Sequence, residues 1–282
     1  MRVWRYAAVG ACAVGIGVAV TLSSRYRTSD LWPVWAALAV SLCGAAAVVW
    51  FYGLHRWREL SSAWQVKVGD AVWPTLAVVT GVLVSLLFGE LASGSPGSAW
   101  RGDVLVTVAF LGGSSAAMAM FGVGAAAARL PAVGGRERRA DLDGSAAWRT
   151  AVDLGALRRT LRGLATALGS LVALSTLALG ASVLMTGAPR ETVLVLGAGG
   201  SLVVGVCYSP AAVAIRRAGG QLVEEVFANA APGSPGELVE QLEQRARLEQ
   251  LVGVDRTLLG ELQAAIPVAG PLLAGASILL PG

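Results

Sequence analysis

Long uncharged apolar runs alternate with short charged segments along most of the 282 residues. A helix needs about 20 apolar residues to cross the hydrocarbon layer of a bilayer, because each residue advances it by about 1.5 Å. The pattern therefore predicts an all-α fold, a polytopic transmembrane helix bundle of six spans. We expect these spans near residues 6–22, 31–52, 71–89, 104–128, 163–189 and 192–215.

The spans and their flanks divide the chain into three expected regions. These are a six-span transmembrane domain, a cytoplasmic helical tail and a C-terminal apolar membrane segment, at residues 1–217, 218–261 and 262–282. Pro267 and Pro271 each remove a helical hydrogen bond from the last segment. This segment is expected either to re-enter the membrane or to form a seventh span.

The first apolar run follows a basic start, as a secretory signal sequence would. It ends in Thr21-Leu22-Ser23-Ser24-Arg25, which is not a small-x-small cleavage motif. We therefore interpret residues 6–22 as a retained span.

Composition agrees with a membrane protein, because 55% of the residues are hydrophobic and 14% are charged. Soluble domains have about 25% charged residues. All but one of the 22 basic residues are arginine, and alanine, glycine and valine are abundant. This composition is typical of a GC-rich bacterial genome and suggests a location in the plasma membrane.

The distribution of basic residues predicts the orientation. If the N-terminus is cytoplasmic, 18 of the 22 basic residues fall in inner segments. The four on the outer side are Arg25, Arg27, Arg101 and Arg190. Basic residues are retained on the cytoplasmic side of short loops, so we expect a cytoplasmic N-terminus and tail.

The stretch VLVLGAGGSLVVG at residues 193–205 resembles a dinucleotide-binding glycine turn. Leu202 occupies the position of the third glycine, and Arg216-Arg217 follows where an acidic residue is required. We instead predict a helix-packing face, because small residues recur there at every fourth position. A second such stripe lies in the fourth span, and a role for the glycines in flexibility or gating is the alternative. The predicted packing residues are Gly197, Ser201, Gly205 and Ser209, and Gly112, Ala116 and Gly124.

Candidate chemistry is sparse. His55 is the single histidine, the three cysteines lie in three different spans, and the centres of the six spans carry no charged residue. Intramembrane charges usually mark ion-coupled transport or catalysis. We therefore predict no catalytic residue, no metal site and no cofactor, and expect that the protein is not an enzyme.

Two cytoplasmic segments carry patterns. In the basic loop at residues 129–162, six arginines could contact anionic lipid, or could serve only to fix the topology. These are Arg136, Arg138, Arg139, Arg158, Arg159 and Arg162. Leu154, Leu157 and Leu161 lie on one side of a helix predicted to begin near Ser145. Between the second and third spans, the spacing of Trp57, Leu60 and Trp64 favours a short interfacial helix or an ordinary connector equally.

The tail is predicted to contain a helix that begins at Ser234-Pro235-Gly236-Glu237, which combines a capping serine with proline in the first turn. Four leucines spaced by three, seven and four residues form a short seam typical of helix association. They are Leu248, Leu251, Leu258 and Leu262.

Two functions remain open on these patterns. The first is a non-catalytic scaffold or partner subunit that associates through its spans and tail. The second is a passive permease or channel, with polar residues such as Thr75 and Glu90 along a path. The expected partners are the lipid bilayer and either a second copy of the chain or another membrane protein, with no nucleic acid.

Overall fold

The computed structural model describes the backbone of residues 2–24, 26–93, 100–130, 144–227, 235–252 and 270. Within these residues the chain is all-helical, which confirms the predicted fold class at that level. The helices are α1 (Arg2–Leu22), α2 (Trp32–Trp64), α3 (Val68–Ser93), α4 (Trp100–Arg129), α5 (Gly144–Thr186), α6 (Glu191–Phe227) and α7 (Pro235–Val252).

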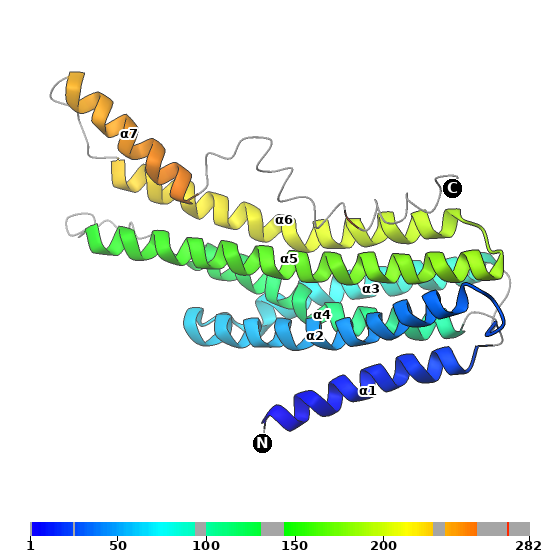
Figure 1. Cartoon of the computed structure of the whole chain (residues 1–282). Coiled ribbons are helices and arrows are strands. Elements are labelled where there is room, and N and C mark those ends of the chain that lie inside the picture. Colours follow the sequence, from blue (N-terminus) through cyan, green and yellow to red (C-terminus); the bar gives the residue numbers. More distant parts are fainter. Residues whose placement is uncertain are drawn as a thin grey trace.

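Successive helices from α1 to α6 run in opposite directions along one bundle (Figure 1). Helices α2, α4, α5 and α6 pack together, with α4 in contact with the other three. Helix α1 lies on the outside of α2, α3 packs on α4, and α7 lies against α5 and α6. In Figure 1, α7 projects beyond the end of the bundle beside the last turns of α6.

Four helices are long and apolar enough to cross a membrane. They contain the segments Trp32–Trp64, Val104–Arg129, Ala147–Thr186 and Glu191–Phe227. In α1 and α3, the described apolar segments are shorter, at Ala7–Leu22 and Val68–Thr80. The structure thus supports a helical membrane protein with at least these four candidate spans.

The contact between α2 and α4 is made by small residues. A Cβ atom added to Gly53 would lie 2.5 Å from the backbone nitrogen of Ala116, and one added to Gly112 would lie 2.7 Å from the Cα of Ala46. The Ser115 hydroxyl donates a hydrogen bond across this contact to the Trp50 carbonyl, at 2.9 Å. The two backbones approach closely because neither helix carries a large side chain at these positions.

Helix α2 continues through the stretch where sequence left two alternatives. It runs without a break to Trp64, and Trp57 and Leu60 are buried in the core. The stretch is therefore neither a separate interfacial helix nor an irregular connector. It ends at Gln65, whose φ of 49° is left-handed and stops the helix.

The other long helices also extend past their apolar runs. Helix α5 begins at Gly144, close to the predicted start, and continues directly into the apolar run. Leu154, Leu157 and Leu161 are buried against the bundle, which confirms the helix predicted to begin near Ser145 and shows that these leucines pack on the other helices. Helix α6 includes all of residues 193–205, so the glycine-rich stretch is helix and contains no strand-turn unit.

Candidate functional site at the basic end of the bundle

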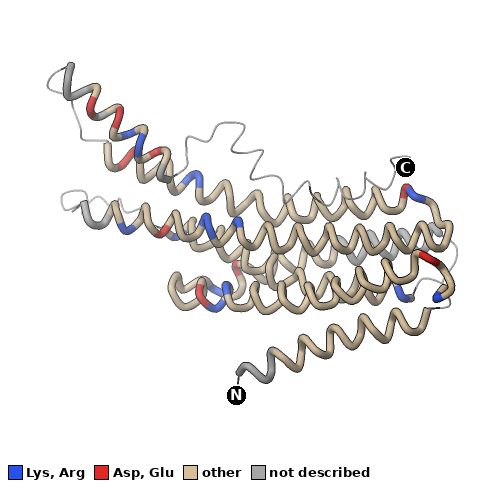
Figure 2. Tube along the Cα trace, viewed as in Figure 1, with Lys and Arg blue, Asp and Glu red and all other residues tan. Residues whose placement is uncertain are grey.

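Charged residues lie at the two ends of the described helices, and the middle of the bundle is free of them (Figure 2). We use the name basic end for the end where α2, α4 and α6 finish and α3 and α5 begin. In α5 the uncharged stretch starts after Arg162, and in α6 it finishes before Arg216. These two arginines are the first charged residues beyond the uncharged stretches of two neighbouring helices.

The register between α5 and α6 brings their basic residues to one level. A Cβ atom on Gly200 would lie 2.1 Å from Cγ1 of Val172, so these two residues face each other across the antiparallel pair. Arg158 lies 14 residues from Val172, or about 21 Å along the axis, and Arg216 lies 16 residues from Gly200, or about 24 Å. The two arginines therefore lie near the same level.

Three arginines influence one another at this level, outside the uncharged stretches. Burial lowers the pKa of Arg158, and the positive charges of Arg162 and Arg216 lower it further. Tyr208 of α6 acts in the opposite direction. Arg158 is half-buried, whereas the neighbouring Arg159 is exposed. Arg162 and Arg216 are exposed, so the two helices form a concentration of positive charge in which one guanidinium, that of Arg158, is partly removed from water.

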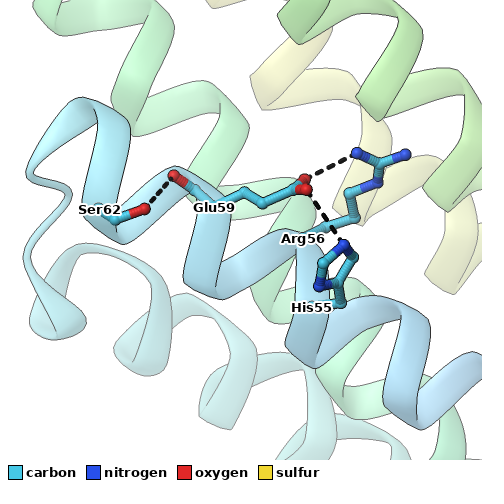
Figure 3. A network of polar contacts seen from close by, with 4 residues as sticks. All are labelled: His55, Arg56, Glu59 and Ser62. Atoms are coloured by element: carbon cyan, nitrogen blue, oxygen red, sulfur yellow. Dashed lines mark hydrogen bonds and ion pairs between the residues drawn. The ribbon is translucent and has the colours of Figure 1, made fainter.

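A second polar group lies on the last turns of α2 (Figure 3). Glu59 accepts a hydrogen bond from Nη1 of Arg56 at 2.7 Å, and its other carboxylate oxygen lies 3.1 Å from Nε2 of His55. Ser62 donates to the Glu59 carbonyl at 3.1 Å, and the Arg56 guanidinium lies over the Tyr52 ring, 5.3 Å from its centroid. All five residues belong to one helix, so the group stabilises the exposed end of α2.

Arg129, the last residue of α4, connects α4 to the turn between α2 and α3. Its Nη1 donates to the Gln65 carbonyl at 2.5 Å, and its Nη2 forms an ion pair with Asp70 in the first turn of α3. The first contact satisfies a carbonyl at the end of α2, and the second adds a carboxylate near the start of α3. This contact was not predicted from the sequence, although the charges of Arg129 and Asp70 are complementary.

The residues of the predicted stripe in α4 lie at helix contacts. Gly112 faces Ala46 of α2, Ala116 is fully buried, and a Cβ atom on Gly124 would lie 3.2 Å from the Cα of Ala211 in α6. One face of α4 thus contacts two helices.

The stripe in α6 is less uniform. Gly197 is buried, Ser201 and Gly205 are half-buried, and Ser209 is exposed and donates to the Gly205 carbonyl at 2.7 Å. The close approach to α5 is made by Gly200, which belongs to a different face and was not singled out from the sequence.

The predicted residues of the tail and of the basic loop are described only in part. Leu248 packs against the hydrophobic core, whereas Val239 and Leu242 of the same helix are exposed. Leu258, Leu262, Arg136, Arg138 and Arg139 lie outside the described residues, as does the side chain of Leu251.

No group of three histidine, cysteine or acidic residues that could hold a metal occurs among the described residues. Comparisons with models of protein families, with curated proteins and with solved structures find no match. The role of the chain is therefore inferred from its own helices and charges, which define a helical protein with four candidate membrane spans.

Proposed function

We propose that this chain is a six-span protein of a bacterial plasma membrane, with a cytoplasmic N-terminus, that acts as a non-catalytic scaffold or partner subunit. In this proposal the basic end lies in the cytoplasm. Helix α7 then binds a second copy of the chain or another membrane protein.

The observation that carries the proposal is the apolar surface of α7. Leu248 packs on the bundle, while Val239 and Leu242 have 57% and 56% of their surface exposed, and Ala246 is also exposed. Val239 and Leu248 are nine residues apart, so they lie on opposite sides of the helix at 100° per residue. One apolar side of α7 therefore packs on the bundle of the same chain, and a second apolar side is exposed.

The charge of α7 favours a protein as the occupant of that second side. The described helix carries Glu237, Glu240, Glu243 and Glu249 against Arg245 and Arg247. Two of the glutamates pair with the arginines one turn away, Glu249 at 2.9 Å and Glu243 at 3.9 Å. An acidic helix is repelled by an anionic membrane surface, so an apolar strip on it is better suited to another protein chain.

The arrangement of charges supports the orientation. Residues 163–186 of α5 and 192–215 of α6 are uncharged, and arginines lie at the basic end of both stretches. The positive-inside rule assigns such an end to the cytoplasm. If each of the six antiparallel helices crosses the membrane once and the basic end is cytoplasmic, α7 also lies in the cytoplasm.

Cysteine crosslinking in native membranes tests the role of α7. The chain offers a suitable background, because Cys12 is its one exposed cysteine among the described residues and can be replaced by alanine. Leu242→Cys tests the available apolar side. Arg247→Cys is the matched control, because it lies on the same helix and is 79% exposed.

We expect Leu242→Cys to form a disulfide-linked product with a second copy or with another protein, and Arg247→Cys to remain monomeric. Adding Val239→Asp to the Leu242→Cys chain should abolish the product, because a charge on the same strip disfavours apolar contact. Equal crosslinking at positions 242 and 247 would indicate random collision and would contradict the proposal. So would the absence of any product at position 242.

A further inference from the structure

The basic end of α5 and α6 lies where the headgroups of a bilayer would lie. The uncharged stretches 163–186 and 192–215 are each 24 residues long, or about 36 Å as helix. A helix of this length crosses a hydrocarbon core about 30 Å thick when it is moderately tilted. Arg162 and Arg216 border these stretches, so the positive charge is at the level of lipid phosphates.

The side chains at this level attract an anion. Arg158 is half-buried between α5 and α6, and its charge is destabilised by burial and by the like charges of Arg162 and Arg216. A bound phosphate would relieve this repulsion, because guanidinium groups donate paired hydrogen bonds to phosphate oxygens. Tyr208 adds a hydroxyl nearby on α6.

An apolar strip on the exposed side of α6 ends near Arg216. Val195, Leu202, Val206 and Val213 are exposed, the first two with 72% and 69% of their surface accessible. Their spacings of seven, four and seven residues place them on one face of the helix. The strip ends one turn before Arg216. An amphiphile with an apolar chain and an anionic head therefore matches this surface better than a free anion does.

We propose that Arg158, Arg162 and Arg216 bind the phosphodiester headgroup of an anionic phospholipid whose acyl chain lies along the exposed strip of α6. This site requires that α5 and α6 cross the membrane, but it does not depend on the proposed association of α7. Basic sites between transmembrane helices on the cytoplasmic side are a general means of holding anionic lipid.

Lipid binding to the purified full-length chain tests the site. Phosphatidylglycerol and phosphatidylcholine are titrated separately onto the detergent-solubilised protein, and bound lipid is counted by native mass spectrometry. The site variant is Arg158→Gln, Arg162→Gln and Arg216→Gln. The control variant removes the same charge at three exposed arginines that are neither in the site nor among the predicted lipid contacts, by Arg149→Gln, Arg190→Gln and Arg217→Gln.

The unmodified chain should bind phosphatidylglycerol in preference to phosphatidylcholine. Each arginine near an anionic headgroup contributes about a fivefold change in affinity, so the site variant should lose roughly a hundredfold. The control variant should lose less than about fivefold. The single variant Arg216→Gln, which keeps the half-buried Arg158, should lose about fivefold and is the measurement to use if the triple variant does not fold.

Two results would overturn the site. If the site and control variants lost phosphatidylglycerol binding equally, the lipid would be attracted by the basic surface as a whole and not by this site. Displacement of the lipid by millimolar inorganic phosphate would mean a site for the free anion. A variant with lysine at positions 158, 162 and 216 should bind phosphatidylglycerol more tightly than the glutamine variant but more weakly than the unmodified chain, because the charge is kept and the paired hydrogen bonds are lost. Binding by the lysine variant as weak as that by the glutamine variant would mean that charge contributes nothing at these positions.

Discussion

Helices α1 and α4 are both apolar and rich in glycine and alanine, yet their glycines have opposite surroundings. Each Cβ atom added to Gly112, Gly113 or Gly122 of α4 would lie within 2.8 Å of an atom of another helix. A Cβ atom added to Gly10 or Gly15 of α1 would have no atom of another helix within 4 Å among the described residues. A glycine-rich pattern therefore shows that another helix could approach the backbone closely. It does not show that one does so.

The difference depends on the partner helix. Gly112 meets Ala46, and Gly53 of α2 meets Ala116, so small residues are matched on both sides of the α2–α4 contact. In α1, Gly17 alone makes such an approach, 3.0 Å from the Cα of Val40. Dispersion attraction between two membrane helices is strong where small residues let the backbones come close. Among the described residues of α1 this occurs only near Gly17.

The largest expected effect is at Gly53. Gly53→Leu would force a side chain into the backbone of α4, and overpacking of this kind costs about 1 to 3 kcal/mol of unfolding free energy. Gly15→Leu in α1 is the matched control and should change stability by less than about 0.5 kcal/mol. Reversible unfolding in mixed micelles measures both.

A comparable loss of unfolding free energy in Gly53→Leu and Gly15→Leu would contradict the difference in packing between α4 and α1. It would mean that α1 packs against protein at Gly15, and that the contacts of α1 in the described structure are incomplete.

A smaller effect is expected at the end of α4. Arg129→Gln removes the ion pair with Asp70 and weakens the bond to the Gln65 carbonyl. Both side chains of the pair are more than a third exposed, so the expected loss of unfolding free energy is about 0.2 to 1 kcal/mol, less at high salt. A double-mutant cycle with Asp70→Asn isolates the energy of the ion pair. A coupling energy near zero would show that the pair does not contribute to stability.

An effect of similar, small size is expected at Ser115. Ser115→Ala keeps the small side chain at the α2–α4 contact but removes the hydroxyl that donates to the Trp50 carbonyl. Hydrogen bonds between membrane helices contribute about 0.6 kcal/mol on average. The same unfolding assay should therefore rank this variant well below Gly53→Leu. A loss as large as that of Gly53→Leu would show that the hydrogen bond, rather than the close backbone approach, holds the two helices together.

The sequence predicted the apolar cores of the helices better than their ends. Residues 31–52 were expected as a span because charged residues begin at Arg56 and are costly in lipid. The helix continues to Trp64 because Trp57 is buried, with its ring against Gly122 of α4. Such a contact depends on the three-dimensional neighbour and leaves no local sequence signal beyond helical periodicity.

The sequence singled out only part of the proposed lipid site. Arg158 and Arg162 were predicted as lipid contacts from the excess of arginine near the fifth span, which stays a prediction. Arg216 and Tyr208 were not, because they lie about 50 residues further along the chain. Their proximity follows from the antiparallel register fixed by Gly200 and Val172, and one sequence without its fold does not reveal that register.

The central claim, six spans with the basic end in the cytoplasm, is tested most directly by labelling single cysteines with a membrane-impermeant maleimide. With Cys12 replaced by alanine, cysteines at positions 97 and 190 should react in intact cells. Cysteines at positions 67 and 225 should react only after the membrane is permeabilised. Labelling of positions 67 and 97 from the same side of the membrane would contradict the six-span arrangement. Protection of position 97 together with labelling of position 67 in intact cells would contradict the orientation.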